Sequence, residues 1–185
     1  LLEMEPLETD RDSFTPATST VDQGWLIVES AYSFIDQRGS KDTHSFPEFI
    51  ARYGLADWFE LRFGASYEVG GAGNPISSGG GGPGRGDPGE IESESQLSYG
   101  FKIGLTQQDA WKPRSALILQ GKSPTSGPEA TSQFVGTYVL GWQFANGWMW
   151  DSAVRFATDE FEADRHSLWA PSTVLKVPVG ERWNA

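Results

Sequence analysis

Four charged residues that lie close together in the sequence are the first candidates for chemistry: Glu48, Arg52, Glu60 and Arg62. Two carboxylates that flank a substrate can act as general acid and general base, as they do in glycosidases. Arginines beside them would keep both carboxylates ionised, and an ionised carboxylate is a poor general acid. We therefore expect a charged constriction for a ligand or a structural network of compensating charges.

The chain contains few residues of the other types that commonly act as nucleophiles, general bases or metal ligands. The chain has no cysteine and only two histidines, His44 and His166, so thiolate sites and three-histidine metal sites are excluded. A hydrolase that pairs His44 or His166 with a serine remains a lesser alternative. We expect a protein that is not an enzyme and needs no cofactor or metal.

Composition narrows the class of protein further. The 185 residues include 14 basic and 25 acidic side chains, for a net charge of -11, which would repel a nucleic-acid backbone. No apolar run approaches the roughly 20 residues of a membrane helix. A membrane strand stays possible, because its signal is alternation rather than bulk hydrophobicity.

Alternation with a period of two recurs along the chain, bounded by Gly, Pro, Asn and Asp, whereas helical spacing is nearly missing. This pattern predicts an all-β, antiparallel, up-and-down fold with about eight strands. The predicted strands lie at 25–36, 46–69 (a hairpin), 92–105, 114–122, 133–144, 148–157 and 167–179. The strand at 114–122 has ambiguous parity, so either of its faces could be the apolar one.

The hairpin gives the strongest register prediction. Aromatic and aliphatic residues occupy one parity and charged residues the other. A tight turn centred on Ala56 would place Tyr53 opposite Phe59 and Arg52 opposite Glu60. A one-residue slip would put charges among aromatics, so we expect the pairing to be strongly specified.

The polar parity of the predicted strands mixes acidic and basic side chains with small residues, which is typical of a confined wet lumen. We predict that ten charged residues face this lumen: Glu29, Glu48, Arg52, Glu60, Arg62, Glu68, Lys102, Asp151, Arg155 and Lys176.

The connections predict two unlike ends of the sheet. Short ones fall at 55–57, 106–113, 145–147 and 180–182, and longer ones at 37–43, 70–91, 123–132 and 158–166. We expect 70–91 to be a flexible Gly-rich loop, 1–20 an extended arm or plug, and 21–185 part of a barrel. The first residue is Leu1 rather than Met, and residues 179–185 resemble a turn that leads into an absent strand, so we expect the chain to be incomplete.

Strand length and tryptophan placement favour a membrane barrel. The alternating runs reach 10 to 13 residues, whereas globular strands average about 5 to 6 and membrane strands need about 9 to 11. Five tryptophans near the short-turn ends are predicted to line a membrane interface: Trp25, Trp58, Trp111, Trp148 and Trp183. The alternative is a soluble β-sandwich of the carbohydrate-binding type, whose exposed tryptophans stack on sugars.

Several segments resemble the outer-membrane β-barrel family named for a MetA pathway of phenol degradation. Residues 8–15, ETDRDSFT, resemble its N-terminal Thr-Asp-Arg-Pro-Asp-Phe-Thr box, except that Asp12-Ser13 departs from Pro-Asp. Its first strand is similar to GWLIVESAY at 24–32, and its Arg-Tyr-Gly-Leu-Thr-Asp hairpin to FPEFIARYGLADWFELRFG at 46–64. Residues 122–127, KSPTSG, resemble its Leu-Pro-Thr-Gly loop; after 130 the likeness is loose.

The resemblance implies barrel architecture in the outer membrane of a Gram-negative bacterium. It also implies a passive channel or uptake protein for small hydrophobic or aromatic solutes, with membrane lipid as its partner. The identity of the solute and the oligomeric state do not follow from it.

Overall fold

A computed structural model describes residues 10, 15–36, 42–71, 91–126, 132–161, 164–179 and 183–184. Every regular element in these ranges is a β-strand. No helix there has the length and apolarity needed to cross a bilayer. The expected Gly-rich loop falls almost entirely outside the described residues.

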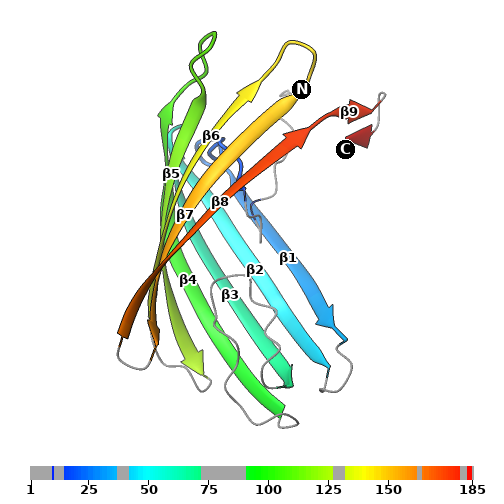
Figure 1. Cartoon of the computed structure of the whole chain (residues 1–185), viewed down its shortest axis with the longest axis vertical. Coiled ribbons are helices and arrows are strands. Elements are labelled where there is room, and N and C mark those ends of the chain that lie inside the picture. Colours follow the sequence, from blue (N-terminus) through cyan, green and yellow to red (C-terminus); the bar gives the residue numbers. More distant parts are fainter. Residues whose placement is uncertain are drawn as a thin grey trace.

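The sheet is an antiparallel meander in which each strand pairs with its sequence neighbours, in the order β1 to β8. It curves into a half-barrel (Figure 1), and β9 and β10 form a separate two-stranded hairpin. This confirms the all-β, up-and-down prediction. The strands are β1 Leu26–Ile35, β2 Thr43–Ala56, β3 Phe59–Gly71, β4 Ile91–Thr106, β5 Arg114–Ser126, β6 Gln133–Gln143, β7 Met149–Phe161, β8 Asp164–Lys176, β9 Pro178–Val179 and β10 Trp183–Asn184.

One predicted long connection is wrong. The segment 158–166 pairs as the end of a hairpin, with Thr158 opposite Ser167 and Phe161 opposite Asp164. His166 therefore belongs to β8 and lies opposite Asp159 in β7. The backbone pairing includes the acidic residues Asp159 and Glu160 and extends to Phe161 and Asp164.

The register predicted for the β2–β3 hairpin is also wrong, by two residues. Arg52 lies opposite Arg62, and Tyr53 lies opposite Leu61. The turn falls at Asp57-Trp58, and an irregularity between Gly54 and Ala56 shifts the pairing. A shift of two preserves the faces, because side chains alternate with a period of two. The alternation therefore specified which face of the hairpin each side chain lies on, but not which residues pair across the two strands.

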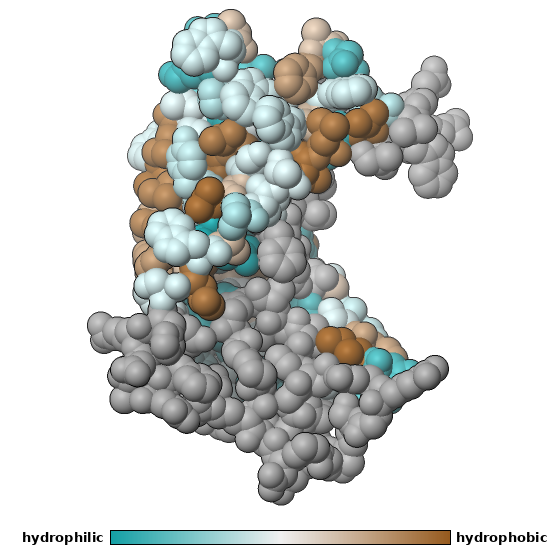
Figure 2. Space-filling view, viewed as in Figure 1, coloured by the Kyte–Doolittle hydropathy of each residue, from teal (hydrophilic) through white to brown (hydrophobic). Residues whose placement is uncertain are grey.

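The two faces of the sheet are chemically opposite. Apolar side chains on the outer face are about half exposed, such as Phe63 at 47% and Val154 at 43%. Charged side chains on the inner face are buried, such as Arg52 at 3% and Arg62 at 4%. Figure 2 shows brown apolar residues interleaved with pale aromatic ones over the described part of the wall.

The observed register predicts a specific cross-link in a chain that contains no cysteine of its own. Ala51 lies opposite Phe63, so Ala51→Cys with Phe63→Cys should form an intramolecular disulfide on mild oxidation. The matched control, Ala51→Cys with Leu61→Cys, tests the pairing expected from the sequence and should cross-link poorly. Non-reducing electrophoresis checks both, and preferential linkage of 51 with 61 would contradict the observed register.

Candidate functional site

Three cations from neighbouring strands converge on the inner face of the half-barrel. Arg52 comes from β2, Arg62 from β3 and Lys102 from β4, and all three are almost wholly buried. Arg52 and Arg62 are direct cross-strand partners. Like charges in that position repel each other, and burial strengthens the repulsion. The wall therefore needs negative charge between them.

Asp10 supplies that charge from the N-terminal side of the sheet. Its Oδ2 lies 2.6 Å from Arg62 Nη1, 3.1 Å from Lys102 Nζ and 3.5 Å from Arg52 Nη1. Its Oδ1 accepts a hydrogen bond from the backbone N–H of Ala17 at 2.8 Å. One carboxylate thus contacts all three cations of the wall.

Two further carboxylates complete the group, which we call the charge cluster: Asp10, Glu29, Arg52, Glu60, Arg62 and Lys102. Glu29 Oε1 lies 2.7 Å from Arg52 Nη2, and Glu60 Oε1 lies 2.7 Å from Arg62 Nη1. Glu60 also lies opposite Lys102 in the β3–β4 register. Three cations and three carboxylates give zero net formal charge, and they do so only with Asp10 included.

Residues 15–22 lie against the sheet near this cluster. The backbone N–H of Val21 donates to Glu60 Oε2 at 2.8 Å, and that of Asp10 donates to Glu29 Oε2 at 3.1 Å. At the far side, Thr15 Oγ1 donates to Ser172 Oγ of β8 at 2.8 Å. We call Asp10 together with 15–22 the arm. Its contacts reach from the charged strands to β8.

Gly54 of β2 lets the arm approach the wall. A Cβ at this position would collide with the backbone carbonyls of Val21 and Asp22. The backbone N–H of Gly24 donates to the Gly54 carbonyl at 2.8 Å. The absence of a side chain at Gly54 is thus a condition for arm docking.

The electrostatics of Asp10 follow from its surroundings. Burial alone would raise the pKa of its carboxyl group. The attraction of Lys102, Arg62 and Arg52, together with the hydrogen bond from Arg62, outweighs burial and holds the pKa of Asp10 well below its usual value. Asp10 is therefore an ionised partner of the wall at neutral pH.

The other predicted lumen residues also lie on the inner parity but outside the cluster. Glu48, Glu68 and Asp151 are buried, and Lys176 Nζ lies 3.7 Å from Asp151 Oδ2. Arg155 is partly buried in β7. The ten residues are thus spread over the wall, and the structure gathers Glu29, Arg52, Glu60, Arg62 and Lys102 at one place.

A second, apolar region occupies the inner face of β5 to β7. It contains buried aliphatic residues, and its members are Ala116, Ile118, Val135, Val139, Ala153 and Ala157. The structure settles the ambiguous parity of the 114–122 strand, since Ala116 and Ile118 point inward. Sequence reasoning missed this region because Asp151 and Arg155 share the parity of Ala153 and Ala157 on β7, which made that face look polar.

The tryptophans predicted at the short-turn ends are exposed where the structure describes their side chains. Trp58 sits in the β2–β3 turn, and Trp25 precedes β1, whose first residue Leu26 pairs near that turn at Tyr53. Trp111, between β4 and β5, is 86% exposed, and Trp148 precedes β7. The side chain of Trp183 lies outside the described residues.

The sites considered for catalysis do not come together. His44 is exposed, its Nδ1 lies 2.7 Å from the Tyr32 hydroxyl, and its ring packs on Phe34 at 5.1 Å. The side chain of His166 lies outside the described residues. Among the described residues, no group of three or more His, Asp or Glu side chains is arranged to hold a metal ion.

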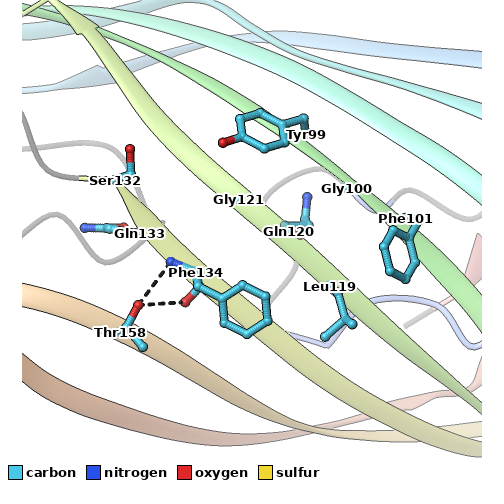
Figure 3. Close-up of a pocket in the computed structure, with 10 residues that line it drawn as sticks. All are labelled: Tyr99, Gly100, Phe101, Leu119, Gln120, Gly121, Ser132, Gln133, Phe134 and Thr158. Atoms are coloured by element: carbon cyan, nitrogen blue, oxygen red, sulfur yellow. Dashed lines mark hydrogen bonds between the residues drawn. The ribbon is translucent and has the colours of Figure 1, made fainter.

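A separate pocket of about 700 Å³ opens over β4 to β7, and most of its lining side chains have the outer parity. Figure 3 shows Tyr99, Phe101, Leu119 and Phe134 around Gly121, which carries no side chain to fill the space. The Tyr99 ring lies close over Gly121. This pocket belongs to the apolar outer face and is distinct from the charge cluster.

Asp10 is the important residue that sequence reasoning did not single out. It falls inside the Thr-Asp-Arg box of residues 8–15, where the segment was treated as a single arm with no assigned contacts. The signal was the cross-strand pairing of two cations, Arg52 and Arg62, with Lys102 on the next strand. A correct register would have shown that Arg52 lies opposite Arg62.

Comparison with known proteins adds no relative: no protein-family description, curated protein or solved structure matches the chain.

Asp10 should contribute a large, pH-dependent share of stability. Asp10→Asn leaves three buried cations facing two carboxylates, so we expect a loss of about 3 kcal/mol in the free energy of unfolding at pH 7. Because the pKa of Asp10 is lowered on folding, the difference between wild type and variant should persist down to about pH 4. It should shrink as the pH falls further through the folded-state pKa.

Urea titrations at several pH values measure this difference. Asp22→Asn is the matched control, since Asp22 lies in the arm with an exposed side chain. Equal stabilities for wild type and Asp10→Asn at pH 7 would show that Asp10 does not hold the cluster together.

Proposed function

We propose that this chain forms part of the wall of an outer-membrane β-barrel in a Gram-negative bacterium. In this proposal the barrel is a passive channel or uptake protein for small hydrophobic or aromatic solutes. The observation that carries the proposal is the inversion of faces, with Phe63 and Val154 about half exposed while Arg52 and Arg62 are buried. Soluble proteins rarely expose continuous apolar surfaces of this kind.

Strand dimensions support the membrane setting. The eight sheet strands contain 10 to 16 residues, and a tilted strand of about 9 to 11 crosses a bilayer. Exposed tryptophans at the short-turn end suit the boundary between acyl chains and water. A sheet edge cannot remain unpaired in lipid. We therefore infer that further strands close the barrel between the two edge strands, β1 and β8. The half-barrel would then be one part of a closed wall.

The proposed channel needs no cofactor. A solute would enter between the longer connections and move down its gradient past the inner face. The arm lies across that route, anchored by Asp10 and by Thr15 at β8, and would act as a partial plug. The resemblance of 46–64 to the phenol-degradation family is the basis for proposing hydrophobic or aromatic solutes.

The second candidate is a soluble carbohydrate-binding module, and the exposure of Trp111 and Trp169 favours it. A β-sandwich buries one face of each sheet against a second sheet. The described strands form one eight-stranded sheet and a short hairpin, with the apolar face outward. This arrangement supports the barrel wall over the sandwich.

Membrane insertion predicts a depth-dependent response to charge on the outer face. Val154 lies near the middle of β7, whereas Leu105 lies near the end of β4, and both are exposed. Val154→Arg should cost about 2–4 kcal/mol of stability in a bilayer, and Leu105→Arg about 0–1 kcal/mol. Resistance of the full chain to alkaline carbonate extraction should therefore fall for Val154→Arg only. Release of the wild type into aqueous buffer would contradict the membrane proposal.

Transport predicts faster entry of apolar aromatic solutes into intact Gram-negative cells. Cells that express the full chain should take up labelled toluene at several times the initial rate of cells that do not. Val154→Arg is the matched control, because it should fail to insert. Equal toluene uptake by cells with and without an inserted barrel would rule out the transport role while leaving the fold untouched.

A further inference from the structure

We propose that the three wall cations of the charge cluster form a carboxylate-binding site, which Asp10 occupies as an internal ligand. The external ligand would be a small monocarboxylate with an apolar body, such as an aromatic acid, that exchanges with the arm. The claim that this ligand is transported rests on the proposed function. The claim that it binds does not.

The contacts of Asp10 are those of a bound ligand. Oδ2 takes all three contacts from the wall, and Oδ1 takes its hydrogen bond from Ala17, within the arm itself. The cations come from three adjacent strands, so the sheet holds them in place whether or not the arm is docked. A carboxylate from another molecule would meet the same donors.

Charge defines the ligand class. Without Asp10, the cluster has Arg52, Arg62 and Lys102 facing Glu29 and Glu60, an excess of one positive charge. A monocarboxylate restores neutrality. A neutral solute leaves the excess in place, and a dicarboxylate reverses it. Removing a carboxylate from three buried cations is costly, so the site should select an anionic group over a neutral one.

The apolar region of β5 to β7 begins directly beside the cluster. Lys102 of β4 lies opposite Ile118 of β5, and both side chains are buried on the inner face. The direct partner of Ile118 in β6 is Thr137. Val139, two residues further along β6, lies opposite Ala116 in β5 and Ala153 in β7. A ligand with its carboxylate on Lys102 would therefore extend its hydrocarbon body over aliphatic side chains.

Arm docking and ligand binding would then compete. The arm is held at the cluster by Asp10 and by the Val21 hydrogen bond to Glu60. A carboxylate ligand replaces the Asp10 contacts. The arm then keeps only neutral-donor hydrogen bonds to the wall, such as Val21 to Glu60 and Thr15 to Ser172, and each of these is individually modest. An amphipathic acid would thus displace Asp10 from the cluster and loosen the arm on the inner face.

Titration of the purified full chain with sodium benzoate tests the site, with benzyl alcohol as the neutral ring of matched size. Asp10→Asn should bind benzoate at least tenfold more tightly than wild type, because the competing carboxylate is gone. Adding Lys102→Met should weaken benzoate binding at least tenfold, whereas adding Lys112→Met in the exposed β4–β5 connection should not. Equal affinity of Asp10→Asn for benzoate and benzyl alcohol would overturn the proposal.

A second measurement covers the case in which Asp10→Asn does not fold. Thr18 in the arm is buried, and Thr18→Cys would introduce the single cysteine of the chain. Benzoate should accelerate thiol labelling of Thr18→Cys severalfold, and benzyl alcohol should not. Labelling that benzoate leaves unchanged would overturn the proposed exchange. Both readouts work in detergent or buffer, so their failure is distinguishable from failure of membrane insertion.

Discussion

The structure depends on resolving the repulsion between two buried arginines that face each other across β2 and β3. Arg52 and Arg62 would destabilise the pairing of these strands if no carboxylate lay between them. Glu29 and Glu60 each neutralise one of them, and Lys102 adds a third cation. Asp10 supplies the third carboxylate for the three cations. The position of the arm and the pairing of β2 with β3 therefore depend on the same ionic contacts.

The same constraint organises the inner face. Most of the clustered charges lie on β1 to β4, where Asp10 contacts them. Aliphatic residues such as Ile118 and Val139 lie on β5 and β6, and Asp151 and Arg155 follow on β7. Neither half alone would suit a solute that is apolar at one end and charged at the other. Lys102 and Ile118 are cross-strand partners, so a charged and an aliphatic side chain lie side by side on the inner face. The arm contacts both the charged strands and β8.

Most of the fold could be predicted from the sequence, and the candidate site could be predicted only in part. Eight strands and the division into apolar and charged faces follow from alternation, which is a local property of each strand. The partners across the hairpin do not, because Gly54 and the turn at Asp57-Trp58 shift the register by two without changing either face. The hairpin at 158–166 was missed for a related reason, since acidic residues such as Glu160 can pair in a strand as well as lie in a loop.

The sequence by itself determined which side chains share a face, because a period of two places alternate residues on opposite sides of any strand. It also determined that Arg52, Arg62 and Lys102 share the buried face with several glutamates. Only the tertiary structure decided that Arg52 meets Arg62. It also decided that Asp10, which precedes both arginines by more than forty residues along the chain, contacts both of them. Such contacts depend on the electrostatic interactions among charges on separate segments. A local sequence pattern does not contain that information.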